Sequence, residues 1–171
     1  CLMAQTLLAG NLDIKNGKWK ITFNKNTQTV DYLYQETTLL KETFVQAINA
    51  SGEVLKSSDY PIATLKRENI SDTFGKGKKY TYVYSGRPGK ENLEQVFYFY
   101  PARNYLLTEA YLISDQRTSC NWIAPVMSNT SSTFLPADGD NRLLDVPFDN
   151  DSFRGYSANP WNTSSVSCEV T

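Results

Sequence analysis

The sequence predicts an all-β fold, an antiparallel β-sandwich with long irregular loops in its C-terminal third. Apolar and polar residues alternate over several segments, which is the period of a strand with one buried face. Turns containing Gly or Pro separate these segments, and no long segment has the apolar spacing of an amphipathic helix. The chain has 171 residues, enough for one domain with a sizeable core.

The first two predicted strands form a hairpin. In residues 17–23, GKWKITF, the side chains of Trp19, Ile21 and Phe23 share one face, and residues 29–35 return after the turn NKNTQ. Further strands are predicted over residues 39–49, 62–69, 78–85, 93–101, 104–114 and 121–127. The last residues also alternate, so a strand is expected around Cys168.

Rows of tyrosine mark two of these strands. Tyr80, Tyr82 and Tyr84 alternate along one strand, and Tyr98 and Tyr100 along the next. Either row could form an aromatic platform for a glycan, but such rows more often line a sandwich core with their hydroxyls at its rim. We therefore predict a core role.

Both ends of the chain suggest a longer exported protein. Residues 1–9 are apolar and uncharged, which is typical of the tail of a secretory signal peptide cleaved after Ala9 or Ala4. A short hydrophobic strand and a lipoprotein anchor at Cys1 are the alternatives. Residues 10–171 are then expected to be an N-terminal β-sandwich domain of a periplasmic or extracellular protein, with a further domain downstream.

Composition excludes several function classes. The chain has no His, so Ser-His-Asp and Cys-His catalytic systems and His-ligated metal sites are excluded. The net charge of −1 gives no general attraction to nucleic acid. No apolar stretch is long enough for a membrane span. Cys120 and Cys168 could pair in an exported protein or remain free.

Aspartates are concentrated near the C-terminus, at Asp138, Asp140, Asp145, Asp149 and Asp151. Such a cluster could bind calcium, but the spacing of an EF-hand loop is missing. It could hold a catalytic carboxylate pair, but two acids on one strand do not flank a scissile glycosidic bond. It could also be a loop that docks on another domain through backbone hydrogen bonds.

A sugar-contacting loop is the remaining interpretation and is compatible with docking. Carboxylate and amide groups bond sugar hydroxyls, and aromatic rings cover the apolar face of a pyranose. We therefore expect no catalytic, metal or cofactor site here, and the predicted substrate-binding residues are Asp149, Asn150, Asp151, Phe153, Arg154, Tyr156 and Trp161.

A family resemblance follows from the segments NGKWKITFNKNTQTVDYL, FYFYPARNYLLTEAYL, NWIAPV and LPADGDNRLLDVPFDNDSFRGYS. In this order they resemble the N-terminal domain of α-galactosidase-like glycoside hydrolases of clan D, around family 36, from polysaccharide-degrading bacteria. The resemblance implies a β-sandwich packed beside a downstream (β/α)8 catalytic barrel that carries both catalytic aspartates. The implied partners are that catalytic domain and a carbohydrate substrate.

Three function classes stay open at the level of the sequence. The first is a non-catalytic accessory domain of a secreted α-galactosidase-like hydrolase, with the loop from Val146 to Tyr156 facing the barrel. The second is an independent carbohydrate-binding module. The third is a purely structural or interaction domain.

Overall fold

The computed structural model describes residues 12–101, 103–128, 142–147 and 163–169, the last two ranges as backbone strands only. The chain divides into two compact units, Cys1–Ser132 and Thr133–Thr171. In the described part of the chain the only helix is a single 3-10 turn, and none is long and apolar enough to cross a membrane.

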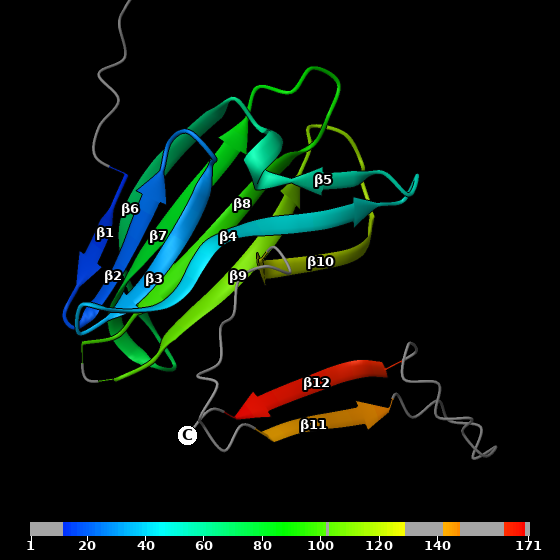
Figure 1. Ribbon diagram of the computed structural model, residues 1–171. Coiled ribbons are helices and arrows are strands. Elements are labelled where there is room, and N and C mark those ends of the chain that lie inside the picture. The colour runs from blue at the N-terminus through cyan, green and yellow to red at the C-terminus, as the bar shows by residue number, and fades with distance from the viewer. Residues whose placement is uncertain (1–11, 102, 129–141, 148–162, 170–171) are drawn as a thin grey trace, which may run out of the picture. The chain divides into compact units, whose positions relative to one another are not determined.

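The first unit contains two antiparallel sheets, which Figure 1 shows face to face. One sheet has the strand order β1-β2-β3-β4-β10, with β5 also paired to β4, and the other has the order β6-β7-β8-β9. The strands of the first unit are β1 (Ile14–Asn16), β2 (Trp19–Asn24), β3 (Thr29–Tyr34), β4 (Thr37–Asn49), β5 (Val54–Lys56), β6 (Ile62–Asp72), β7 (Gly75–Ser85), β8 (Asn92–Phe99), β9 (Leu106–Ile113) and β10 (Cys120–Met127). The predicted all-β sandwich is therefore confirmed.

The first sheet pairs two strands that are distant in the sequence. Strand β4 pairs with β3 on one side, and on the other side it pairs with β10, where Asn49 lies opposite Cys120. Cys120 carries a free thiol that donates to the backbone carbonyl of Trp122 at 2.8 Å. The sheet is thus complete only when a late segment of the chain returns to an early one.

The core lies between the two sheets and is rich in aromatic rings. The first sheet contributes Ile21, Phe23 and Tyr32, and the second contributes Tyr82 and Phe97, all almost fully buried. The ring of Tyr82 meets Phe97 edge to face at 5.8 Å and Phe23 at 5.1 Å. The predicted core role of the β7 tyrosine row is confirmed, since Tyr80, Tyr82 and Tyr84 all belong to this cluster.

The hydroxyl groups of Tyr82 and Tyr84 are hydrogen-bonded, as is usual for buried polar groups. The Tyr82 hydroxyl donates to the backbone carbonyl of Leu12 at 2.5 Å. The Tyr84 hydroxyl donates to the Gln95 side-chain carbonyl at 3.2 Å, and the Gln95 amide nitrogen donates to the carbonyl of Pro125 at 2.8 Å. A fully buried glutamine therefore connects β8 to β10 of the opposite sheet.

Alkaline pH is expected to unfold the domain through these phenols. Burial is the main cause that raises the pKa of Tyr32, Tyr82 and Tyr84 far above the ordinary value of about 10. Because the folded-state pKa is raised, this contribution to stability is complete below pH about 10 and is lost as the pH rises above it. The urea midpoint should be level between pH 7 and 9 and fall steeply beyond pH 10.

Two measurements check the alkaline prediction. Absorbance of tyrosinate should show that the buried phenols ionise only together with the loss of native circular dichroism, and Tyr84→Phe should reduce the pH dependence of the urea midpoint. Ionisation of every tyrosine in a chain that keeps its native spectrum would contradict the prediction.

The second unit contains one antiparallel pair, β11 (Arg142–Pro147) and β12 (Thr163–Glu169). Strand β12 was predicted from its alternation. No strand was predicted over residues 142–147, where the structure has β11. Pro147 ends the strand beyond a register shift, a position where its missing N–H removes no regular ladder bond.

Candidate functional site

The substrate-binding residues predicted from the sequence lie outside the described part of the chain. Asp149, Asn150, Asp151, Phe153, Arg154, Tyr156 and Trp161 all belong to residues 148–162. Of the aspartate cluster, the structure places only Asp145, in the backbone of β11. The sugar-contacting loop thus remains a prediction, and a candidate site must be sought in the first unit.

A cleft at one end of the sandwich combines aromatic rings with polar side chains. The cavity measures about 100 Å³, and we call it the Trp19 cleft. It is lined by Asn16, Gly17, Lys18, Trp19, Tyr34, Phe99, Tyr100, Pro101, Arg103, Asn104 and Tyr105. These residues come from the β1–β2 turn, the end of β3 and the connection between β8 and β9, so both sheets contribute.

The β1–β2 hairpin sets the position of Trp19. Asn16 pairs with Trp19, which leaves a two-residue turn, and its first residue, Gly17, has a φ of 60°. Two-residue hairpin turns need a positive φ at that position, which glycine adopts without steric cost. Trp19 is therefore the first residue of β2, at the end of the sheet, where one part of its ring faces the core and another faces the cleft.

Tyr34 stands beside Trp19 as its cross-strand partner. The two ring centroids are 4.9 Å apart with an interplanar angle of 57°, and the Lys18 ammonium lies 5.9 Å from the Tyr34 ring centre. The turn that follows Tyr34 has positive φ at both Gln35 and Glu36, and the Gln35 amide donates to the Lys18 carbonyl at 2.8 Å. This bond ties the two adjacent turns together.

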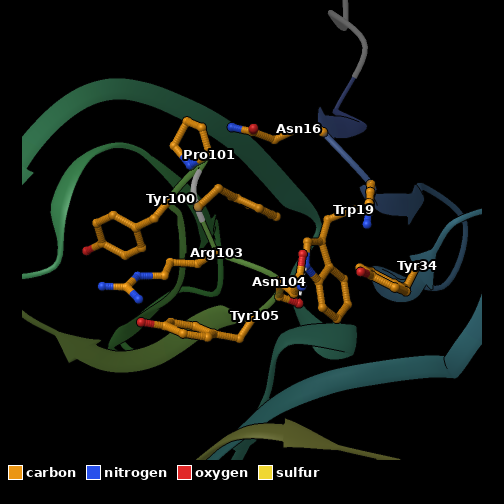
Figure 2. A pocket seen from close by; sticks show the side chains of 11 residues that line it. Asn16, Trp19, Tyr34, Tyr100, Pro101, Arg103, Asn104 and Tyr105 are labelled. Carbon is orange, nitrogen blue, oxygen red and sulfur yellow. Dashed lines mark hydrogen bonds between the residues drawn. The ribbon is translucent and has the colours of Figure 1, made fainter.

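The connection between β8 and β9 forms the opposite wall. The Trp19 indole N–H donates to the Asn104 carbonyl at 3.2 Å, and the Arg103 amide donates to the Tyr100 carbonyl at 2.9 Å. Figure 2 shows the side chains of Arg103, Tyr100 and Tyr105 directed to the same side, with Trp19 and Tyr34 together on the other. The indole bond thus joins the two sheets at the floor of the cleft.

Tyr100 is the fixed member of this wall. Its ring is almost fully buried, and its hydroxyl donates to the Asp72 carboxylate at 2.6 Å. Burial, followed by this bond to a carboxylate, raises the pKa of Tyr100 to about 12. Tyr105, in contrast, keeps 40% of its surface exposed, so its ring is available to a ligand.

The chemistry available in the Trp19 cleft is that of recognition. Aromatic faces, amide groups and cations line it, whereas no Asp, Glu, Cys, Ser or Thr is among its lining residues. Glycoside hydrolysis needs two opposed carboxylates, and the described residues that line this cleft supply none.

A second, more open cleft of about 450 Å³ lies between the β7–β8 and β9–β10 connections. It contains two carboxylates, Glu91 and Asp115, but no aromatic ring. A hydrogen bond within Glu91 itself, together with bonds from Thr118 and Asn49, lowers the Glu91 pKa. A general acid requires a raised pKa. The lowered pKa does not suit Glu91 to act as a general acid. Its carboxylate accepts a hydrogen bond from the Thr118 hydroxyl at 2.9 Å.

The two members of the other tyrosine row lie in different environments. Tyr98 faces outward from β8, and its hydroxyl donates to the Glu109 carboxylate at 2.7 Å, while Tyr111 donates to the same oxygen at 2.6 Å. These two bonds are the main cause that lowers the Glu109 pKa. Tyr100, in contrast, is almost fully buried at the end wall of the Trp19 cleft. The predicted core role is therefore confirmed for Tyr100 and wrong for Tyr98.

Sequence reasoning placed Trp19 in the core and did not single out Arg103, Asn104 or Tyr105. A signal was present, because PARN follows the apolar strand FYFY as a polar turn with proline. Within the described ranges, no group of three or more His, Cys, Asp or Glu residues is placed to hold a metal ion.

No protein-family model matches this chain, and neither a curated protein nor a solved structure matches it.

Proposed function

We propose that this chain is a non-catalytic β-sandwich domain that binds carbohydrate through the Trp19 cleft. The observation that supports the proposal is the pairing of the Trp19, Tyr34 and Tyr105 rings with the polar groups of Asn16 and Asn104 in one cleft. Aromatic faces cover the apolar face of a sugar ring, and amide groups both donate to and accept from hydroxyls.

The size of the cleft limits what it can hold. Pockets that enclose drug-sized ligands usually measure roughly 300 to 1,000 Å³, and this cavity measures about 100 Å³. We expect it to receive one sugar residue, with the rest of a glycan extending into solvent. A single sugar contact of this kind gives weak binding, which suits a domain that works beside another domain or in several copies.

The resemblance to α-galactosidase-like hydrolases implies that the sugar-binding sandwich belongs to an exported enzyme, in which a catalytic barrel follows it in the chain. That setting remains a prediction from the sequence. The cleft favours the binding-module interpretation within it, because every lining residue comes from residues 16–105. Sugar binding should then be measurable with this chain alone, whereas a purely supporting domain would show none.

Alanine substitution at Trp19 is the direct test. Calorimetric titration of the 171-residue chain should identify a ligand. The candidates are trisaccharides of galactose, xylose and glucose. Trp19→Ala should then weaken binding by at least about thirtyfold, because a central aromatic anchor contributes about 2 kcal/mol or more.

Two further variants separate binding from folding. Tyr105→Ala removes an exposed ring and should weaken binding roughly two- to tenfold with an unchanged melting temperature. Tyr111→Ala removes a ring of similar exposure on the outer face of the β6-β7-β8-β9 sheet, away from the cleft, and should leave binding intact. Absence of binding to every trisaccharide, or binding that survives both Trp19→Ala and Tyr105→Ala, would refute the proposal.

A further inference from the structure

The Trp19 cleft has a charge imbalance that a neutral sugar would not use. Lys18 and Arg103 line the cleft, and none of the described residues that line it is acidic. None of the ion pairs among the described residues includes either cation. Cations without an ion-pair partner at a binding surface attract anionic groups, because the Coulomb energy is favourable even in a high effective dielectric.

Two acidic side chains next to the cleft residues in contact or in sequence are engaged elsewhere. Asp72 accepts the Tyr100 hydroxyl at 2.6 Å with one oxygen and the Phe74 amide at 2.8 Å with the other. Glu36, two residues beyond Tyr34, lies 3.9 Å from the Lys15 ammonium. Neither carboxylate lines the cleft, so the two cations are not neutralised within it.

Arg103 is the better placed of the two cations. The hydrogen bond from the Arg103 backbone amide to the Tyr100 carbonyl fixes the backbone here. Figure 2 shows the Arg103 guanidinium extended beside the Tyr105 ring. A guanidinium presents parallel N–H donors that match the two oxygens of a carboxylate or a sulfate. Lys18, held near the Tyr34 ring at 5.9 Å, adds a second positive charge at the other wall.

We propose that the ligand of the Trp19 cleft is an anionic saccharide, with Arg103 bonding its carboxylate or sulfate group while Trp19 and Tyr105 contact the sugar rings. This inference rests on the proposed function, since it specifies the charge of the sugar that the same cleft binds. Both cations are exposed, so water and salt weaken the attraction. We therefore expect a preference of about tenfold at low salt, not an absolute requirement.

Trigalacturonate and its fully methyl-esterified form make a matched pair of probes, because esterification removes the charges and keeps the rings. At low salt the chain should bind the acid about tenfold more tightly than the ester, and 0.5 M NaCl should reduce the ratio to near one. A trisaccharide of galactose with and without sulfate esters is the second arm. A preference confined to this arm assigns the anionic group as sulfate.

Arg103→Gln is the decisive variant, because it keeps hydrogen-bonding capacity and removes the charge. It should weaken binding of the anionic probe more than binding of the methyl ester, so that the preference falls well below tenfold. Arg117→Gln, in the second cleft, is the control and should keep the preference. Equal affinity for anionic and neutral probes, with binding that still depends on Trp19, would overturn this inference alone. No Trp19-dependent binding of any probe would overturn the proposed function as well.

Discussion

Phe97→Ala should destabilise the domain by about 3 to 5 kcal/mol, the usual cost of removing a fully buried aromatic ring. The Phe97 side chain is 0% exposed and lies between the rings of Tyr82 and Tyr32, 5.8 and 5.7 Å away. Alanine at this position leaves a cavity at the centre of the sandwich, because rings on both sheets are held by their own hydroxyl bonds and cannot close over it.

Urea unfolding followed by circular dichroism measures this effect. Phe97→Leu is the matched control and should cost far less, since leucine refills most of the space. Tyr111→Ala, at a site 43% exposed, should change stability by only about 1 kcal/mol. Equal losses for Phe97→Ala and Tyr111→Ala would mean that the core does not lie between these sheets.

Gln95→Leu should cost roughly 2 to 4 kcal/mol, although it replaces a buried polar side chain with an apolar one of similar size. The Pro125 carbonyl loses its donor at 2.8 Å, and the Tyr84 and Tyr32 hydroxyls lose bonds of 3.2 and 3.3 Å. A buried group left without a partner costs about 1 to 3 kcal/mol, more than an average hydrogen bond contributes.

A double-mutant cycle with Tyr84→Phe separates the effect of the lost hydrogen bonds from the effect of changed side-chain packing. The second change removes the hydroxyl that donates to Gln95, so the double variant should be more stable than the sum of the two losses predicts. Strict additivity would show that Gln95 and Tyr84 are not coupled, and a Gln95→Leu protein as stable as the original would show that this network contributes nothing to the stability of the fold.

The sequence was informative where one face of a strand is buried and the other is not. Ile21 and Phe23 alternate with polar residues, and burial follows that alternation because side chains of a strand point to opposite faces. The same reasoning predicted the core role of Tyr82. It failed for β11, whose short apolar core is flanked by Arg142 and Asp145 and has no extended alternation.

The candidate site was less predictable for a physical reason. Periodicity tells which face of the sheet a side chain lies on, but not how far along the sheet the opposing layer extends. Trp19 shares the face of Ile21 yet lies at the end of the strand, where the β8–β9 connection replaces the opposing sheet. The cleft depends on the pairing of Trp19 with Asn104, which are 85 positions apart, and no local pattern encodes it.

The pairing of β4 with β10 has a consequence for how the chain folds. The first sheet is complete only after Asn49 pairs with Cys120. The hydrogen bond from the Tyr82 hydroxyl to the Leu12 carbonyl also joins residues 70 positions apart. Closing loops of this length loses chain entropy before any contact compensates, so domains dominated by such contacts fold in milliseconds to seconds. During synthesis at about 5 to 20 residues per second, most of this chain must emerge before its core can form. Over those seconds the aromatic strands β7 and β8 lack the opposing sheet that buries their rings in the folded domain.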